Sequence, residues 1–485
     1  QNAPTAVTII DRRMIEAAGV TAIPDLLRLV PGFQVYTPSH GHRVFNYHTL
    51  PDGFPGRMEV KIDGRPAYEP LTSTVFWITQ GIDVDEIEYI EVVRGSNVPA
   101  NGANAINGSI NIFTRSPLKS QGLRVRTEAG SLDTRNFFGS FSDTVGDVSY
   151  RLSTRYGYSS GFPDYKPPNE SDNLRRPSDT SEPFDVNDDS EALAINLNVL
   201  WAPTLQDNIN IQLGLSDTNF VFDENNTGAT PEELFDWDFE YSFQMLDWQH
   251  QLDSHNELRT VFYHNRLEFD AFSDILPLSE VFGAPADILM AVYGIRDEDY
   301  ILGTKDAVSE RYDLELRHTG KLNARAKFSW GGALRLDRAR SQFYFSTYDA
   351  QSEEYYRLFG NLEYQPVKPL TYNLGIQVAR NHNIGTYPSF RFSSNLHIDD
   401  HNTLRLTYNR AKRSPTVFEF NYFRVLNQDG EILLYDTVSD PQIKEEDFQG
   451  VEVGYYGNFL NGALTVDVKW FRDRNDNLVA NREDE

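Results

Sequence analysis

A two-residue alternation of apolar and polar side chains runs through most of this chain and constrains its fold more than any other feature. It recurs in about 15 segments from Gly122 onward, each bounded by turn residues. Because successive side chains of a β-strand point to opposite faces, each segment predicts a strand with one apolar and one polar face. Clear examples are residues 193–201, 209–215, 235–243, 372–378 and 451–455.

The connections between these segments broadly alternate in length, which separates two β architectures. Residues 204–207, 253–256, 366–369 and 399–402 are short turns, whereas residues 159–189, 216–234, 272–304 and 414–447 are long. A membrane β-barrel has short turns on its periplasmic side and long loops outside. The pattern therefore favours an antiparallel transmembrane barrel whose polar strand faces line a wet lumen. The alternative β protein is a secreted adhesin or lectin, whose apolar faces would meet in a core.

Composition narrows the possible function classes. The chain has 485 residues, and its 71 acidic residues against 44 Lys and Arg give a net charge of −27, which argues against a nucleic-acid clamp. No stretch approaches the roughly 18 consecutive apolar residues of a membrane-spanning helix. With 0 Cys there is no disulfide, thiolate metal site or Cys nucleophile. No GxSxG, HExxH, phosphate-loop or dinucleotide motif occurs, so we expect no enzyme activity, no bound cofactor and no metal site.

The first part of the chain has a different texture from the rest. Residues 23–30 (IPDLLRLV) predict a short helix that ends at Pro31 and Gly32. Residues 58–63, 87–93 and 109–114 predict brief strands separated by glycine-containing turns. We therefore expect a small α+β domain over residues 1–117 and a barrel domain over residues 122–485.

Five short motifs in the first domain follow the order of one known family. They are VTIID at 7–11, DLLRLVPG at 25–32, IDGRP at 62–66, IEYIEVVRG at 87–95 and NGANAINGSINIFT at 101–114. The chain thus resembles the TonB-dependent outer-membrane receptors, in which an N-terminal plug fills a β-barrel. The resemblance implies a barrel of about 22 strands, of which about 15 are present. Because an odd count cannot close an antiparallel barrel, we expect the C-terminal strands to lie outside this chain.

The resemblance also implies a function and partners. The receptor would be a monomer in the outer-membrane lipid of a Gram-negative bacterium. Coupled to TonB and the energised inner membrane, it would take up a scarce, bulky nutrient. A ferric siderophore is the substrate expected first, with haem, cobalamin or an oligosaccharide as alternatives, and a passive porin-like barrel or a surface adhesin as a different class. No TonB-binding segment precedes Ala3, so that segment would lie upstream, or coupling would be absent.

In this family an Arg of the IEVVRG element forms salt bridges to acidic side chains of the barrel wall, and Arg94 matches that position. The segments RSPTVFE at 413–419 and DPQIKEE at 440–446 resemble wall motifs of the family. Together with the strand that follows, they imply Glu419, Glu446 and Glu452 as partners that lock the plug, with solvated wall charges as the alternative. The family's RG before the IDG strand has no match, because Tyr47-His48 occupies that region.

Aromatic side chains in two plug segments predict where a ligand would bind. Aromatic faces with few charges suit a flat or conjugated ligand such as a catecholate iron chelate, a porphyrin or a corrin. Haem would need a His ligand, and only His40, His42 and His48 cluster. In haem receptors of this family a ligating His is expected in the loop after the RSP segment, and residues 414–447 contain none, so the resemblance favours a siderophore. Packing beneath the plug is the alternative role for two of the aromatic residues, Phe76 and Trp77. The predicted ligand-binding set is Tyr47, His48, Phe54, Tyr68, Phe76 and Trp77.

Overall fold

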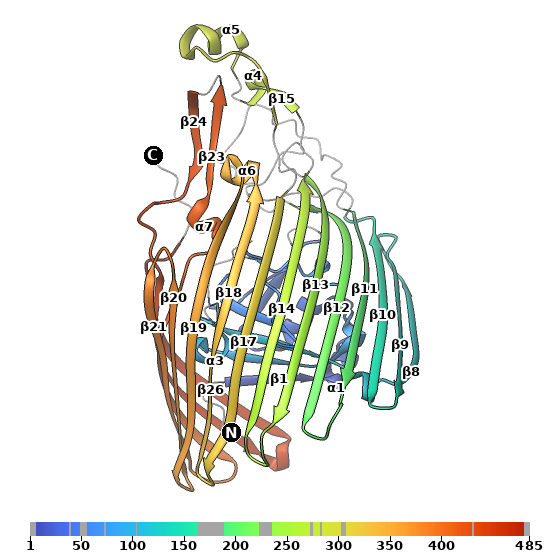
Figure 1. Cartoon of the computed structure of the whole chain (residues 1–485), viewed down its shortest axis with the longest axis vertical. Coiled ribbons are helices and arrows are strands. Elements are labelled where there is room, and N and C mark those ends of the chain that lie inside the picture. Colours follow the sequence, from blue (N-terminus) through green and yellow to red (C-terminus); the bar gives the residue numbers. More distant parts are fainter. Residues whose placement is uncertain are drawn as a thin grey trace.

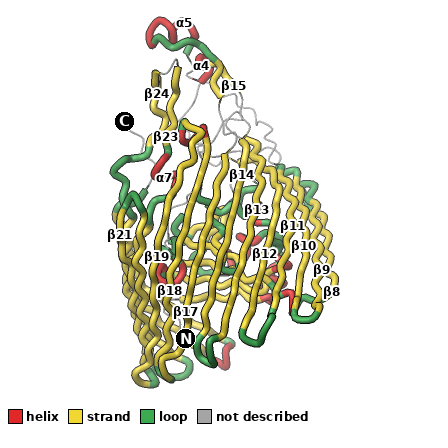
Figure 2. Tube along the Cα trace, in the orientation of Figure 1, coloured by secondary structure: helices red, strands yellow, loops and turns green. Residues whose placement is uncertain are grey.

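The computed structural model describes residues 6–37, 40–48, 56–71, 74–102, 104–162, 189–222, 235–271, 275–281, 284–301, 307–428 and 431–479. These residues form two parts: a small mixed domain, and a curved antiparallel sheet that bends around it without closing (Figure 1). Figure 2 shows that long strands make up the enclosing wall, whereas helices are short.

The enclosed domain, the plug, has a five-stranded sheet in the order β1–β6–β7–β4–β5. β4 and β7 are parallel, and the other pairs are antiparallel. β-branched residues occur along the central strands, and Val60, Ile90, Val92 and Ile110 are fully buried in one core. The plug elements are β1 (Ala6–Asp11), α1 (Arg12–Ala18), α2 (Ile23–Leu26), β2 (Gln34–Tyr36), β3 (Val44–Asn46), β4 (Met58–Ile62), β5 (Arg65–Pro66), β6 (Ile87–Arg94), α3 (Val98–Asn101) and β7 (Gly108–Thr114).

Two plug helices differ from the sequence prediction. The helix expected over residues 23–30 ends as α2 at Leu26 and continues as a 3₁₀ turn, Leu27–Leu29. The first helix, α1, has no clear apolar periodicity, so the sequence reading missed it. Its start is set by Asp11, whose side chain accepts the backbone N–H of Met14 at 2.9 Å, and its end by Gly19 at φ 63°.

Fifteen strands form the wall, in the order of the chain, and β8 and β26 are the two edges of the sheet. This confirms the predicted antiparallel barrel sheet of about 15 strands. The strands are β8 (Gly122–Ala129), β9 (Arg135–Val145), β10 (Val148–Ser159), β11 (Ser190–Trp201), β12 (Asp207–Phe222), β13 (Phe235–Gln251), β14 (Glu257–Ala271), β17 (Ala307–Asn323), β18 (Ala326–Ser341), β19 (Thr347–Val367), β20 (Leu370–Asn381), β21 (Gly385–His397), β22 (Asn402–Arg413), β25 (Glu446–Phe459) and β26 (Leu464–Asp476).

The two ends of the wall differ. Tight turns close one end, as between β11 and β12, whereas the opposite end carries long connections with small elements of their own (Figure 1). This is the alternation that the sequence predicts. The small elements are β15 (Ile275–Pro277), α4 (Leu278–Val281), α5 (Ala286–Ile288), β16 (Asp299–Ile301), α6 (Gln342–Phe345), α7 (Val417–Asn421), β23 (Phe423–Gln428) and β24 (Glu431–Val438).

An apolar belt surrounds the outside of the wall. On β20, Leu374 and Ile376 are 50% and 53% exposed, while the alternate residues Asn373 and Gln377 are buried toward the lumen. Exposed apolar side chains at this density suit a hydrocarbon environment, and the polar inward residues suit a lumen. Further members of the belt are Leu246, Trp248, Phe262, Leu314, Leu316, Trp330, Leu334, Leu358, Leu404, Leu406, Val453, Val468 and Trp470.

No helix in the described ranges is both long and apolar enough to cross a membrane.

The upper part of β13 reverses the predicted orientation. The sequence reading placed its aromatic residues on the outside and its acidic residues in the lumen. Instead Trp237 and Phe239 are each 1% exposed, and the ring of Phe239 lies 4.8 Å from that of Phe76 in the plug. Asp238 and Glu240 face outward, near the end of the strand that leads to a long loop. Period-two alternation identifies the two faces of a strand but not which face is inside, so plug packing decides here.

Candidate functional site: the plug–wall interface

A cluster of acidic residues in the plug forms its densest ionic contact with the wall. The sequence DVDE at residues 83–86 folds as a 3₁₀ turn with a capping box, in which Asp83 accepts the Asp85 N–H at 2.9 Å and Glu86 accepts the Asp83 N–H at 3.1 Å. We call Asp83, Asp85 and Glu86 the acidic turn. The turn directs its three carboxylates toward the first wall strands.

Five arginines surround the acidic turn. Arg126 of β8 binds Asp83 at 2.9 Å and Asp85 at 3.2 Å. The Glu86 carboxylate accepts the Ser153 hydroxyl at 2.6 Å. Burial raises the pKa of the Asp83 carboxyl, and the Asp85 N–H and Arg126 act in the opposite direction, so the carboxylate depends on these donors. The other arginines are Arg12 at 2.8 Å and Arg124 at 3.3 Å from Asp85, Arg151 at 3.6 Å from Glu86, and Arg155 at 4.0 Å from Asp83.

Arg94, the predicted lock residue, does contact the wall, but not through the predicted carboxylates. It pairs with Asp467 of β26 at 3.0 Å, and Arg405 of β22 lies 3.7 Å from the same carboxylate. The expectation that Glu419, Glu446 or Glu452 pairs with Arg94 is therefore wrong. Asp467 is not singled out by any motif, because the register of β25 and β26 that brings it to the plug is not visible in the sequence.

The three predicted wall carboxylates have other partners. Glu446 bridges plug and wall, since it binds Arg57 of the plug at 2.7 Å and Arg413 of β22 at 2.7 Å. Glu419 caps α7 and pairs with Arg413 at 2.8 Å. Arg413, which is 2% exposed, thus neutralises two of the three acids.

The third carboxylate, Glu452, reaches the plug beside Gly95. It pairs with Lys469 at 3.3 Å, and the same ammonium donates to the Tyr47 hydroxyl at 3.2 Å. Gly95 has φ 106°, and a Cβ there would lie 2.5 Å from a Glu452 oxygen. The RG pair of the plug motif therefore needs glycine both for its backbone conformation and for this close approach.

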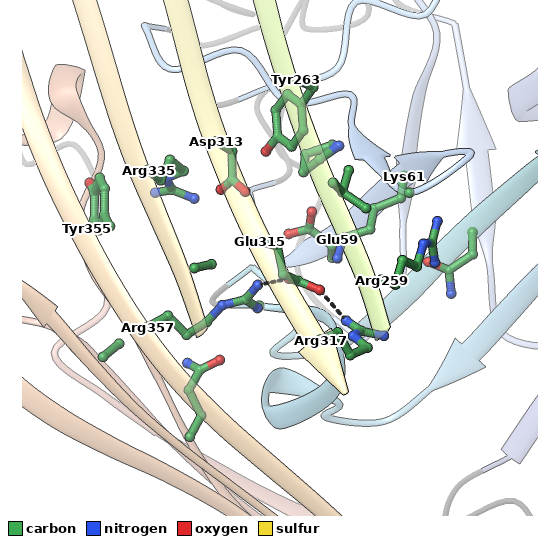
Figure 3. Close-up of a pocket in the computed structure, with 18 of the residues that line it drawn as sticks. Glu59, Lys61, Arg259, Tyr263, Asp313, Glu315, Arg317, Arg335, Tyr355 and Arg357 are labelled. Carbon is green, nitrogen blue, oxygen red and sulfur yellow. Dashed lines mark hydrogen bonds and ion pairs between the residues drawn. The ribbon is translucent and has the colours of Figure 1, made fainter. Parts of the chain in front are cut away.

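A cavity of about 260 Å³ separates β4 of the plug from the wall strands β14 and β17–β21. Its lining is strongly charged (Figure 3). On the wall, Glu315 binds Arg317 at 2.7 Å and also pairs with Arg357. From the plug, Glu59 and Lys61 line the same space. Such a lining needs water or a polar solute to satisfy it.

Glu59 is 4% exposed, and neither it nor Lys61 forms an ion pair or side-chain hydrogen bond with any described residue. Burial raises the pKa of Glu59, while Lys61 and the wall arginines oppose this. Burial lowers the pKa of Lys61, and Glu59 opposes it. Both plug groups therefore carry a desolvation cost that no direct partner offsets.

Most of the predicted ligand-binding aromatics are packed inside the structure. Tyr68 and Trp77 belong to the plug core, at 2% and 8% exposure, and Phe76, at 2%, packs against wall aromatics. Tyr47, at 5%, stacks on Phe33 with ring centroids 4.9 Å apart. Core packing covers these four rings, as in the alternative role considered for Phe76 and Trp77, and their contact with a ligand stays a prediction.

The two remaining members of that set have different outcomes. His48 is exposed, stacked between Tyr47 and Phe471 at ring distances of 4.0 and 4.2 Å, and stays a predicted ligand contact. Phe54 lies outside the described residues.

The three clustered histidines do not converge on one point. His40 contacts Ser190 of β11 at 2.9 Å, His42 is 4% exposed beside Phe76, and His48 lies against β26. Burial lowers the pKa of His42 to about 3, so it is neutral. Within the described ranges no group of three His, Cys, Asp or Glu side chains is arranged to hold a metal ion.

Comparisons with known proteins agree with this architecture. Residues 1–109 match the family model of the TonB-dependent receptor plug domain. The fold of the whole chain, wall included, agrees with that match. Of this chain, 98% superposes on 73% of a ferric enterobactin receptor variant of Pseudomonas aeruginosa bound to enterobactin, with a TM-score of 0.76 and 13% identity. The chain has the plug-and-barrel fold of the TonB-dependent receptors.

Other proteins that are similar to this chain differ in what their names say they carry. The alcaligin outer-membrane receptor FauA of Bordetella pertussis matches 98% of this chain and 71% of its own, with a TM-score of 0.68 and 14% identity. The probable TonB-dependent siderophore receptor PiuA of Acinetobacter baumannii is 28% identical over 128 residues, and the vitamin B12 transporter BtuB of Vibrio cholerae is 31% identical over 127 residues. These matches cover 26% of this chain and only 16% and 20% of the two relatives.

Proposed function

We propose that this receptor takes up a ferric siderophore by a TonB-dependent mechanism, as a monomer in the outer membrane of a Gram-negative bacterium. The observation that carries the proposal is a folded plug inside a membrane-type wall, held there by ionic contacts. A filled lumen does not suit a passive pore. Transport would therefore require the plug to change its arrangement, and the ligand can favour that change only by binding one arrangement more tightly than the other. TonB, driven by the inner membrane, would supply the work.

Cobalamin is the second candidate, because the similarity to BtuB is as strong as that to PiuA. Haem ranks below both, since the clustered histidines point to separate contacts. A charged plug–wall cavity favours hydrophilic chelates over a flat apolar porphyrin.

A fluorescence titration of the full-length, detergent-solubilised protein tests this. Catecholate and hydroxamate ferric siderophores, haem and cobalamin would each be titrated while tryptophan emission is recorded. Saturable quenching at nanomolar concentration by one ferric chelate supports the proposal. Quenching by cobalamin alone would replace the substrate, and silence across the panel would contradict siderophore binding.

A further inference from the structure

Ionic contacts between plug and wall are unevenly distributed around the plug. Among the described residues, the ion pairs that join plug and wall fall into two groups. One group involves β8 and β10, and the other involves β25, through Glu446, and β26. The wall strands from β11 to β22 form none with the described plug. Their contacts are hydrogen bonds such as Arg311 to the Tyr68 carbonyl at 3.1 Å and Asn265 to the Pro66 carbonyl at 3.0 Å, and ring packing around Phe76.

The charged cavity lies on this side without ion pairs. It separates β4 from β14 and β17–β21, and β4 forms no ion pair or side-chain hydrogen bond with the described wall. The contacts on this side come from its neighbours: Arg65 of β5 donates to Tyr241 and Asn265, and α3 packs against β19–β21. β4 is also weakly supported within the plug sheet. It has five residues, pairs in parallel with β7, and on its other side has only the two-residue β5.

The cavity lining determines what withdrawal of β4 would create. Glu59 and Lys61 of the plug face Asp313, Glu315, Arg335 and Arg357 of the wall, and the two plug charges have no described ion-pair partner to lose. Water entering between these groups would hydrate charges that are now poorly solvated. On the β8 side, in contrast, withdrawal would separate the acidic turn from its arginines.

We propose that the plug remains attached to β8 and β10 through the acidic turn and separates from the wall along β4, so that the passage opens at the charged cavity facing β17–β20. This assignment rests on the proposed function, because it concerns the route of a ligand through the lumen. The route is lined by acidic and basic side chains of both parts, so it suits a hydrophilic, charged solute. The acidic turn acts as the fixed side and β4 as the releasing side.

Two disulfides can be engineered to test which side opens, because the chain has 0 Cys. A Cβ on Gly375 of β20 would lie 3.0 Å from the Pro99 Cβ in α3, which borders the cavity side, and 2.7 Å from Asn361 Oδ1, a side-chain atom that must turn aside. A Cβ on Gly81, next to the acidic turn, would lie 3.1 Å from the Ala194 Cβ of β11. Both separations need only a small shift to reach the roughly 3.5–4.5 Å of a disulfide. The releasing-side pair is P99C with G375C, and the fixed-side pair is G81C with A194C.

The readout is the conductance of full-length protein in planar bilayers as urea is raised to about 3 M, a range in which small domains begin to open. Each variant is measured oxidised and then reduced, so the reduced form controls for strain at Gly81, which has φ 69°. We expect the oxidised releasing-side pair to suppress the conductance at least tenfold, with recovery on reduction. The oxidised fixed-side pair should stay within twofold of its reduced form.

Three other results would overturn the assignment. Suppression by the fixed-side pair alone would place the opening at β8–β11, suppression by both pairs would mean that the plug leaves as a whole, and suppression by neither would place the opening elsewhere. Because the conductance measurement uses no ligand, its result does not depend on which substrate the protein carries. Uptake of a ferric siderophore by cells carrying the same variants is measured separately, and its absence in the wild type would contradict the proposed function while leaving the conductance result valid.

Discussion

Replacing Arg126 by Gln should weaken the attachment of the plug at the acidic turn. Arg126 donates two hydrogen bonds to Asp83, at 2.9 and 3.0 Å, and also pairs with Asp85. The Asp83 side chain is 4% exposed and that of Arg126 is 28% exposed. The substitution therefore leaves a buried carboxylate with its main cationic partner removed.

The expected cost lies between two known limits. Exposed ion pairs contribute roughly 0–1 kcal/mol, whereas removing one partner of a buried pair costs about 3–5 kcal/mol. Since Asp83 is buried, Arg126 is partly exposed, and Arg155 at 4.0 Å keeps some compensation, we expect a loss of about 2 kcal/mol. At about 1.4 kcal/mol per factor of ten, this is a decrease of roughly 30-fold in the protection of β6 amides against hydrogen exchange.

Arg135 of β9, whose exposed ion pair lies within the wall, controls for the loss of an arginine charge. It pairs with Asp133 at 2.7 Å, which is closer than the Arg126 contact, but the two side chains are 67% and 52% exposed. Solvent screening should make the loss on Arg135→Gln less than about 0.5 kcal/mol. If hydrogen exchange by mass spectrometry shows equal changes in β6 for the two variants, or less than threefold for Arg126→Gln, then burial does not strengthen this contact and the reasoning fails.

Three further predictions concern the rest of the interface. Because burial raises the pKa of Glu59 above 4.5, protonated Glu59 contributes stability below pH 4.5, and this stability is lost as the pH rises through the raised pKa. Glu59→Gln should therefore reduce the dependence of the plug's urea midpoint on pH. An unchanged dependence would assign the effect to another group. Arg94→Ala and Asp467→Asn should raise the leak conductance of full-length protein similarly, whereas Glu419→Gln should leave it unchanged; an effect of the Glu419 change alone would restore the partner first expected. Phe76→Ala should destabilise the assembly by about 3 kcal/mol, seen as a lower thermal midpoint, while Leu358→Ala on the exposed belt in detergent should cost much less; equal losses would contradict a packing role for Phe76.

Sequence reasoning identified the elements of the wall because strand periodicity is a local property. It found the alternation of Leu374 and Ile376 with Asn373 and Gln377, and it found the short turns. It misjudged the upper part of β13, because the aromatic face there packs on Phe76 of a separate domain. Which face is inside depends on a contact between residues far apart in the sequence, and no period carries that information.

The candidate site was less predictable for the same reason. The motif match placed Arg94 at the wall and named Glu446 as one of its partners, yet Glu446 pairs with Arg57 and Arg94 pairs with Asp467. Charges on a wet wall compete for several partners within a few ångströms, so their pairing depends on strand register. The DVDE turn carried a usable signal, its capping-box spacing, but nothing local indicated that arginines of β8 and β10 would surround it.

A plug held by charges differs physically from one held by apolar packing. Substitution of Arg126 leaves Asp83 buried and poorly compensated, which is why the expected loss is large. Separation of the plug from the wall is different, because both members of each pair return to water, and the net change approaches the roughly 0–1 kcal/mol of an exposed pair. Apolar surface, in contrast, loses about 25 cal/mol for every Å² exposed. The acidic turn is therefore held by the number of its ion pairs and Phe76 by its apolar contact area, whereas the β4 cavity has neither and is the part of the interface that a modest pull opens first.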